Sequence, residues 1–459
     1  MGKYLAYGDY CETDIDWLGK IPSHWSIQRL KFIFDIKKRI AGTLGFDVLS
    51  VTQRGIQVKN IESGEGQLSM DYSKYQLVNV GDFAMNHMDL LTGYIDISQF
   101  NGVTSPDYRV FSINDEKKYD KRYYLYLLQM GYKQRLFFHL GQGSAHLGRW
   151  RLPTEAFNEI RYPVPHNEEQ TQIANFLDHE TAKIDTLIEK QQQLIKLLKE
   201  KRQAVISHAV TKGLNPQVPM KDSGVEWLGE VPEHWVVTRL GFHTLKIGSG
   251  KTPKGGAEVY QKEGVLFLRS QNVYDDGLRI SESENVYISE SIHGEMRTTK
   301  VFGGDILLNI TGGSIGRTCL VPLEFIEANV NQHVCIIRLP DCLREFISMV
   351  LKSTPIKEQI GAIQTGGNRE GLNFEQISKF SFALPPESER YEIVQSVKIS
   401  LAKLDALEEQ SNRAIKLMQE RRTALISAAV TGKIDVRNWQ APDQEIQQQE
   451  VGLSVSTQL

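Results

Sequence analysis

The stretch Trp17-Leu-Gly-Lys-Ile-Pro-Ser-His-Trp25 returns later in the chain as Trp227-Leu-Gly-Glu-Val-Pro-Glu-His-Trp235. Arg29-Leu30 follows the first copy, and Arg239-Leu240 follows the second at the same spacing. Internal similarity of this kind indicates a repeated structural unit. We therefore expect two copies of one fold in the 459 residues, a length that also favours more than one domain.

A second matched pair closes each copy. Tyr162-Pro-Val-Pro165 leads into a helical segment ending at Thr211, and Phe382-Ala-Leu-Pro385 leads into one ending at Thr431. Between these markers the copies diverge, and only weak echoes remain. Gly81-Asp-Phe83 with Asn86 is matched by Gly304-Asp-Ile306 with Asn309. Similar ends with dissimilar middles indicate one scaffold holding two different recognition surfaces; the alternative is a plain duplication whose middles drifted.

The helical segments after Pro165 and Pro385 carry apolar residues in steps of seven, and neither has Pro or Gly in its interior. Sustained heptads of this kind predict a coiled coil. Polar residues interrupt the same rungs in both helices, for example Gln191 and Ser411. We expect the two helices to pair antiparallel, although each could instead pack against its own domain. The predicted coiled-coil core comprises Leu177, Ile184, Leu187, Leu194, Leu198, Val397, Leu404, Leu407, Met418 and Leu425.

These markers divide the chain into two mixed α/β domains with a long helix after each. The predicted parts are a first globular domain at 1–165, a first helix at 166–212, a linker at 213–225, a second globular domain at 226–385, a second helix at 386–434 and a disordered tail at 435–459. The resulting fold class is mixed α/β with a pseudo-twofold internal repeat and an antiparallel coiled coil.

The composition is that of an ordinary globular protein, with 41% hydrophobic and 24% charged residues. We see neither a signal peptide nor an apolar run long enough to span a membrane, and we expect a cytoplasmic protein. The four cysteines form no Cys-x-x-Cys pair, so we predict free thiols and no metal site. The net charge of −3 is low for a protein that binds DNA alone.

Gly-rich polar loops occur in both variable domains, at 141–149 and 364–371. Such loops allow the backbone to approach a phosphate or a base edge, and arginine pairs with guanine as asparagine does with adenine. The alternative is that the loops are surface turns without a binding role. The candidate DNA-contacting residues are Arg54, His146, Arg149, Lys251, Arg269, Asn272, Asn368 and Arg369.

Two segments imitate catalytic motifs without completing them. Gly248-Ser-Gly-Lys-Thr252 resembles the end of a P-loop, but Leu245 stands where the motif needs its first glycine, and Pro253 follows where a helix should begin. Asp107 with Asp115-Glu-Lys117 faintly resembles a metal nuclease triad, but the charged cluster has no apolar strand to orient it. We therefore predict no catalytic residues.

Taken together, these motifs resemble the specificity subunit of a type I restriction-modification system over nearly the whole chain. The resemblance rests on the Trp-Leu-Gly-x-x-Pro-x-His-Trp motif present twice, on Ser249 to Pro253, on Gly304 to Leu307, on Pro165 to Gln170 and on the paired Ala-Val-Thr helix ends. Two departures are local. Glu389-Arg390 stands where the first copy has Glu169-Gln170, and Ile40 to Leu44 stands where the second has Gly-Lys-Thr-Pro.

The resemblance implies two target recognition domains, each reading one half of an asymmetric, bipartite site on double-stranded DNA. It implies that the paired helices set the unread spacer and that two methylation subunits dock on the repeated scaffold. Two restriction subunits would complete the complex. S-adenosylmethionine, ATP and magnesium would be used by these partners, and this chain would bind no cofactor and no membrane. Shared phosphate contacts would fit the weak net charge.

Two other functions stay open on the sequence alone. A stand-alone nuclease or nucleotide hydrolase would show activity in the purified chain that depends on Lys251. A purely structural coiled-coil adaptor would leave the choice of DNA unchanged when the two variable domains are exchanged.

Insertion of one heptad into the first helix is expected to lengthen the spacer between the half-sites without altering either half. A heptad adds ~10 Å of helix, which is close to three base pairs at ~3.4 Å each. The methylated sequence of the variant measures the spacer, and an unchanged spacer would show that the helices do not set it.

Overall fold

The computed structural model describes residues 4–441 apart from 63–68, 70, 144–149, 282, 284 and 366–370. The chain forms two compact units, described here one at a time. Unit 1 comprises residues 1–190 and 414–459, and unit 2 comprises residues 191–413. Each long helix, α3 (Asn167–Lys212) and α8 (Glu387–Val430), contributes one half to each unit. Both boundaries therefore fall inside helices and not in a linker.

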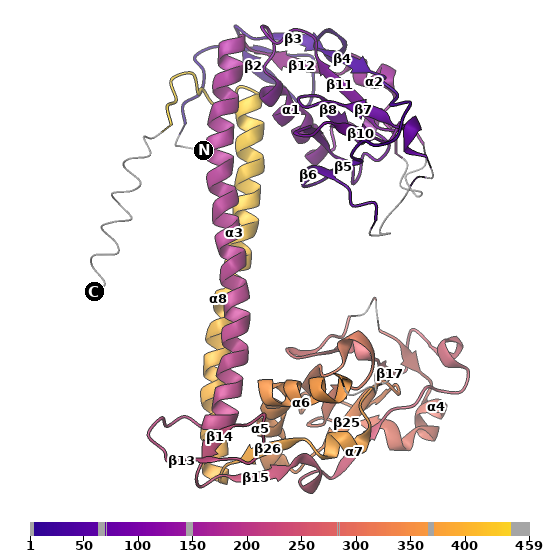
Figure 1. Ribbon diagram of the computed structural model, residues 1–459, viewed down its shortest axis with the longest axis vertical. Coiled ribbons are helices and arrows are strands. Elements are labelled where there is room, and N and C mark those ends of the chain that lie inside the picture. The colour runs from indigo at the N-terminus through magenta and orange to yellow at the C-terminus, as the bar shows by residue number, and fades with distance from the viewer. Residues whose placement is uncertain are drawn as a thin grey trace. The chain divides into compact units, whose positions relative to one another are not determined.

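Unit 1 contains the first globular domain (Figure 1). Its central sheet has the order β4-β11-β8-β9, with all neighbours antiparallel. The helix α1 forms because Asp120 caps its first turn and Tyr123, Tyr124, Leu127 and Leu128 share a buried face. The elements are β1 (Tyr10–Glu12), β2 (Lys20–Pro22), β3 (Ser26–Arg29), β4 (Phe34–Lys37), β5 (Leu49–Thr52), β6 (Gly55–Val58), β7 (Gln76–Val78), β8 (Phe83–Met85), β9 (Ile95–Ile97), β10 (Gly102–Thr104), β11 (Arg109–Ile113), α1 (Lys121–Lys133), α2 (Thr154–Glu159) and β12 (Arg161–Val164).

Unit 2 repeats this plan with other residues. Its central sheet has the order β16-β25-β22-β23, again antiparallel throughout. A second sheet, β20-β17-β24-β21, includes one parallel pair, β17 with β24. The elements are β13 (Met220–Asp222), β14 (Glu230–Pro232), β15 (Val236–Arg239), β16 (Lys246–Ser249), β17 (Val265–Leu268), β18 (Val273–Tyr274), β19 (Gly277–Leu278), β20 (Tyr287–Ile288), α4 (Glu290–Glu295), β21 (Lys300–Val301), β22 (Ile306–Asn309), β23 (Thr318–Leu320), β24 (Ala328–Val330), β25 (Val334–Arg338), α5 (Asp341–Lys352), α6 (Thr354–Thr365), α7 (Phe374–Ser378) and β26 (Ser381–Leu384).

The two long helices pair antiparallel, as predicted. In unit 2 Lys199 contacts Glu408 at 3.7 Å and Arg202 contacts Asp405, so the residue number rises in α3 as it falls in α8. In unit 1 the Arg422 Nε lies 2.9 Å from the Asp185 Oδ1. Because α3 pairs with α8 in both units, a heptad inserted into the first helix alone would have no facing heptad in α8. The insertion expected from the sequence is therefore corrected to a variant that carries one heptad in each helix, and the spacer is measured in that variant.

One of the two predicted heptad rows is confirmed and the other is wrong by one position. Leu177, Ile184, Leu198 and Val397 are buried, and Leu404, Met418 and Leu425 are at least half-buried. Leu187, Leu194 and Leu407 are 40 to 50% exposed and lie outside the seam. The second row instead contains Thr181, Ile188, Ile195 and Arg202 in α3, matched by Leu401, Glu408, Ile415 and Arg422 in α8.

The wrong row has a simple cause. Leu187-Ile188 and Leu194-Ile195 are apolar doublets, so both phases of the helix look equally apolar from sequence. The true seam also includes the charged pairs of Arg202 with Asp405 and of Arg422 with Asp185, which a count of apolar residues does not score.

The predicted linker and tail are more ordered than expected. Met220–Asp222 forms β13, which pairs with β14, so part of the predicted linker at 213–225 is sheet. At the other end the Asp435 amide donates to the Leu5 carbonyl, Val436 is buried, and the Trp439 ring packs on Phe176. The start of the predicted tail therefore belongs to the core of unit 1, and residues 442–459 lie outside the described residues.

In each unit the repeated tryptophan motif is hydrogen-bonded to a glutamate in the first turn of one long helix. In unit 1 the buried Glu169 of α3 accepts hydrogen bonds from Trp25 Nε1 at 3.1 Å and from the Tyr7 hydroxyl at 2.7 Å, and it pairs with His24 at 2.9 Å. In unit 2 Glu389 of α8 accepts from Trp235 Nε1 at 3.1 Å and pairs with His234 at 2.7 Å. A carboxylate in the first turn of a helix also interacts favourably with the helix dipole.

The ring of the same tryptophan packs against the glycine that follows the other long helix. Gly432, just after α8, has a φ of 71°, and a Cβ there would overlap Pro22 and lie 3.1 Å from the Trp25 ring. Gly213, just after α3, has a φ of 74°, and a Cβ there would lie 3.3 Å from the Trp235 ring. Glycine is needed because the left-handed turn must press against an indole.

Substitution of Glu169 by alanine is expected to destabilise the chain by about 3 kcal/mol, because buried Trp25 and Tyr7 donors lose their acceptor. The midpoint of urea unfolding of the full chain, followed by circular dichroism, measures this change. Glu168→Ala is the matched control, since Glu168 is the exposed neighbour on the same turn, and its cost should stay below about 1 kcal/mol. Equal midpoints for the two variants would contradict a central role for the buried carboxylate.

Candidate DNA interface

The central sheets of the two domains end at equivalent asparagines. Asn86 follows β8, and Asn309 ends β22, the strand at the same place in the sheet order. The turns before these strands also match: the Asp82 side chain accepts from the Asn79 amide at 2.8 Å, and the Asp305 side chain accepts from the Phe302 amide at 2.9 Å. The weak sequence echo of Gly-Asp with a following Asn therefore marks a shared strand.

Several loops gather where this sheet ends in unit 2. We define the loop cluster as residues 250–252, 269–272, 310–314, 331–333 and 371–372. Backbone hydrogen bonds hold these loops together. The Lys251 amide donates to the Val330 carbonyl at 3.1 Å, Ile310 donates to His333 at 3.0 Å, and Leu372 donates to Ile310 at 2.8 Å. Segments far apart in the sequence thus form one surface.

Unit 1 builds an equivalent surface on a different set of side chains. The Leu152 amide donates to the His87 carbonyl at 2.9 Å, just as Leu372 does to Ile310. The described residues that follow the two Gly-rich segments are therefore bonded at equivalent places in the two domains. A hollow of about 660 Å³ lies here, lined by residues that include Lys59, Tyr72, Tyr75, Asn86, Asp89, Asp107 and Tyr108. The scaffold is shared, whereas the side chains it presents are not.

Burial sets the charge state of the groups behind the unit 1 surface. Burial is the largest cause that lowers the pKa of Arg109 to about 10, and Arg109 remains a cation stacked on Phe157. Burial, followed by the charges of Arg109 and Arg151, lowers the pKa of His87 to about 3. His87 is therefore neutral near pH 7, and Arg109 holds a positive charge next to Met85, the residue before Asn86.

The predicted contact residues are distributed over both units. Lys251 is exposed and Arg269 is half-buried, and both belong to the loop cluster of unit 2. Arg54 is exposed in the turn between β5 and β6 of unit 1. His146, Arg149, Asn368 and Arg369 lie outside the described residues. The structure thus places Lys251 and Arg269 in loops of the same cluster, and a DNA-contacting role for them stays a prediction.

Asn272 is placed differently from the prediction. Its side chain is 6% exposed, its Oδ1 accepts from the Arg269 amide at 2.9 Å, and its Nδ2 donates to the Arg279 carbonyl at 2.9 Å. A buried amide bonded on both sides holds a turn and does not face a base. The sequence misled because a polar residue in a polar loop can cap the loop as easily as it can face outward.

The P-loop-like segment has a packing explanation. β16 ends at Ser249, and a Cβ on Gly250 would overlap the Val330 carbonyl. Only a short 3-10 turn, Gly256–Val259, follows Pro253. The glycine therefore allows two backbones to approach each other, and the segment lacks the helix that a P-loop uses to bind phosphate.

Sequence reasoning missed three polar residues of the loop cluster, Thr311, Gln332 and His333. Their side chains form hydrogen bonds among the loops. The signal was present in Asn331-Gln332-His333, a polar run between β24, which is buried throughout, and β25, which is buried except at Arg338. In the described part of the chain, no cluster of three or more His, Cys, Asp or Glu is arranged to hold a metal ion. Nor does any described helix have the length and apolar character to span a membrane.

Two α/β domains built on one sheet plan, each with its own loop surface and each followed by a long helix, define a duplicated recognition protein. The family model of the type I restriction modification DNA specificity domain matches the chain twice, at residues 22–197 and 232–417. The chain belongs to this family.

Individual relatives agree with the family assignment. The chain is similar to the EcoBI specificity subunit of Escherichia coli, with 25% identity over 342 residues that cover 72% of this chain and 69% of the relative. It is 24% identical to the EcoKI specificity subunit of Escherichia coli strain K12 over 309 residues, which cover 63% of this chain and 61% of the relative. A solved chain from a study of type I R-M complex assembly shares the fold, with a TM-score of 0.67 at 13% identity over 90% of this chain and 99% of that chain.

Substitution of Asn272 by alanine is expected to act on stability. The variant loses the side chain that holds the 269–272 turn, at a cost of about 1–2 kcal/mol. The midpoint of thermal unfolding measures the loss, and Gln271→Ala, at an exposed position in the same turn, serves as the control. A stable Asn272→Ala chain that binds DNA less well would instead restore this residue to the set of contacts.

Proposed function

We propose that this chain is the noncatalytic specificity subunit of a type I restriction-modification complex, in which each domain reads one half of a bipartite DNA site. The observation that carries the proposal is the pairing of one scaffold with two unlike loop surfaces. The central sheets share strand order and register, and the loops beyond Asn86 and Asn309 are equally long, yet they carry different side chains. A protein that reads two different half-sites needs a constant scaffold and two different binding surfaces.

The chemistry of the loop cluster supports recognition of DNA. Lys251 offers an exposed cation for a phosphate, while Gln332 and Thr311 offer neutral donors and acceptors of the kind that read base edges. The formal net charge of −3 supports a division of labour, in which partner subunits supply part of the phosphate attraction.

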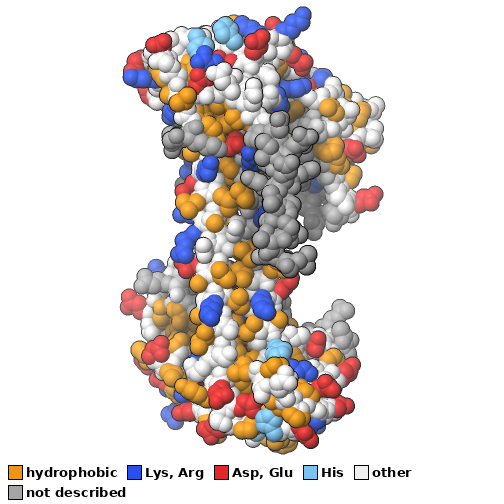
Figure 2. Space-filling view, turned by 90° about the vertical axis from the view of Figure 1, so that its left-hand side faces the viewer, with side chains coloured by type: hydrophobic (Ala, Val, Ile, Leu, Met, Phe, Trp, Pro, Cys, Tyr) orange, Lys and Arg blue, Asp and Glu red, His pale blue; other side chains and the backbone are white. Residues whose placement is uncertain are grey.

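Apolar side chains that remain exposed on the long helices support docking of partner subunits. Surface leucines at this density are unusual for a chain that stays alone. Figure 2 shows hydrophobic side chains on the surface of the long helices. The residues are Leu187 and Leu417 in unit 1 and Leu194, Leu197, Ile399 and Leu407 in unit 2.

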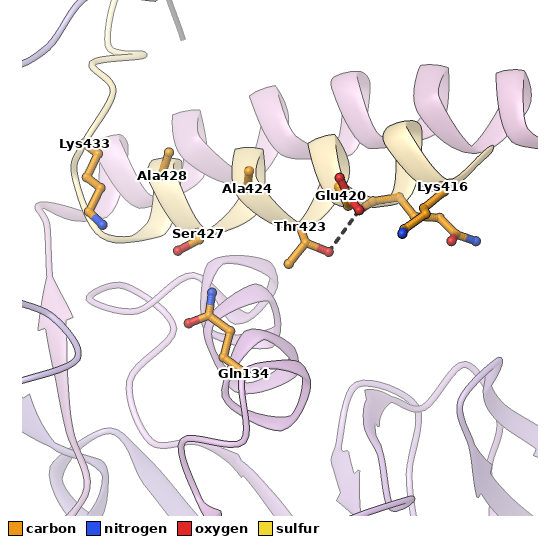
Figure 3. A pocket seen from close by; sticks show the side chains of 9 residues that line it. Gln134, Lys416, Glu420, Thr423, Ala424, Ser427, Ala428 and Lys433 are labelled. Carbon is orange, nitrogen blue, oxygen red and sulfur yellow. Dashed lines mark hydrogen bonds between the residues drawn. The ribbon is translucent and has the colours of Figure 1, made fainter. Parts of the chain in front are cut away.

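Unit 1 also offers a shallow groove between α8 and the end of α1 (Figure 3). Gln134 faces the helix across the groove, and Ala424, Ser427 and Ala428 give the α8 side a low profile. The Thr423 hydroxyl donates to the Gln419 carbonyl in its own helix, at 3.0 Å. Small side chains allow a partner helix to approach closely.

The remaining parts of the proposal concern those partners. Two methylation subunits would dock on the helical scaffold and methylate adenine with S-adenosylmethionine. Two restriction subunits would use ATP and magnesium to move and cut DNA. This chain would bind none of these cofactors and would only choose the site. An adaptor without DNA contacts is less well supported, because an adaptor has no need of two different loop surfaces on one frame.

Genome-wide mapping of methylated adenines in a host carrying the chain with its methylation partners tests the proposal. The expected result is one split sequence with two unlike halves. A chimera whose residues 226–385 come from another family member should change one half and leave the other intact. No methylation that depends on the chain, or an unchanged target in the chimera, would contradict the proposed function.

A further inference from the structure

Four polar side chains from three loops of the loop cluster form a hydrogen-bonded chain in unit 2. The Thr252 hydroxyl is bonded to the Gln332 Oε1. The Gln332 Nε2 lies 3.2 Å from the His333 Nε2, and the His333 Nδ1 lies 2.6 Å from the Thr311 Oγ1. Gln332 is exposed and occupies the middle of the chain between Thr252 and His333.

With the Gln332 amide in this orientation, the hydrogen bonds define the tautomer of a neutral His333. Since an amide nitrogen only donates, the Gln332 Nε2 donates to a His333 Nε2 that carries no proton. The proton of neutral His333 is then on Nδ1, where it is donated to the Thr311 oxygen. The Thr252 hydroxyl donates to the Gln332 oxygen, so the orientation of the amide is fixed from both sides.

The loops that carry these side chains are themselves anchored. The Lys251 amide donates to Val330, and the His333 amide donates to the Asn331 side chain at 3.2 Å. The His333 carbonyl accepts from Ile310, next to Thr311. An exposed glutamine normally loses rotamer freedom when it binds, but much of that loss has already occurred here.

Gln332 keeps half of its hydrogen-bonding capacity. An amide group has two N–H donors and two acceptor lone pairs, and one of each is used inside the chain. One donor and one acceptor therefore remain on an exposed, oriented amide. Adenine presents the complementary pair in the major groove, with N7 as acceptor and the N6 amino group as donor, and glutamine bonds both at once.

We propose that Gln332 reads an adenine in the half-site recognised by the second domain, with Thr252, His333 and Thr311 acting as positioning residues. This inference rests on the proposed function and adds a specificity-determining residue to it. Asn272 provides the contrast, because both sides of its buried amide are bonded to backbone groups of Arg269 and Arg279, whereas the Gln332 amide is oriented and half of its bonding capacity is unused.

The test measures methylation by the complete complex on duplexes that carry each of the four bases at each position of the second half-site. Gln332→Ala is expected to reduce discrimination for adenine roughly tenfold or more at one position, with the first half-site unaffected. Gln332→Glu keeps the acceptor and loses the donor, so preference at that position should move toward cytosine, whose amino group donates. Gln261→Ala, at an exposed glutamine before the start of β17, is the matched control.

The positioning residues have their own readout. Thr311→Val removes the acceptor of His333 and should weaken discrimination at the same position, and Thr311→Ser should restore it. A merely structural role would change the unfolding midpoint without changing discrimination among bases at a single position.

The outcomes separate the two proposals. If the complex containing the native chain methylates no split sequence, the proposed function itself fails. If it methylates one and Gln332→Ala keeps full discrimination, or loses it equally at every position, only the role of Gln332 is wrong.

Discussion

Each unit depends on a tryptophan that joins the beginning of one long helix to the end of the other. In unit 1 the Trp25 indole donates to Glu169 of α3, and its ring receives the turn at Gly432 after α8. In unit 2 Trp235 does the same for Glu389 of α8 and Gly213 after α3. Because a buried carboxylate without donors and a left-handed turn without glycine are both costly, this contact strongly constrains the residues at both helix ends.

This contact explains why the ends of the repeats are alike while their middles differ. The motif residues that surround each tryptophan bond to the helices, so a change in one requires a change in others. The departure at Arg390 fits the same rule, because its guanidinium donates to the Pro385 carbonyl at 2.9 Å, where Gln170 donates to the Pro165 carbonyl at 2.9 Å. Where they are described, the loops at the end of the central sheet do not bond to the helix ends, so their side chains can differ between the two domains.

The sequence predicted features that repeat or that follow a period. The duplication, both long helices, their antiparallel pairing and one heptad row of the seam, from Leu177 to Leu198, all follow from spacing. The family resemblance rested in part on the motifs that the tryptophan contact explains, namely the repeated Trp-Leu-Gly-x-x-Pro-x-His-Trp stretch and the two helix ends.

The sequence did not predict the features that depend on the direction in which a side chain points. The doublet Leu187-Ile188 left the phase of the seam undecided, and the exposure of Leu187 together with the neighbouring ion pairs settles it. Asn272 and Gln332 are both amides in polar loops, yet one is buried in a turn and the other is exposed and oriented by threonine and histidine from distant segments. The predicted linker at 220–222 became a strand because a partner at 230–232 lay within reach.

In each domain the strand that enters from the scaffold is paired with the strand that returns to it, and this pairing affects how genes of this family can evolve. β3, which enters the first domain, is paired with β12, which leaves it, and β15 is paired with β26 in the same way. The two borders of each variable segment therefore lie next to each other in space. Recombination between related genes at these borders can replace a whole recognition domain in one event without changing the helical scaffold. New target sequences are then acquired by exchange, and the slow accumulation of point mutations is not required.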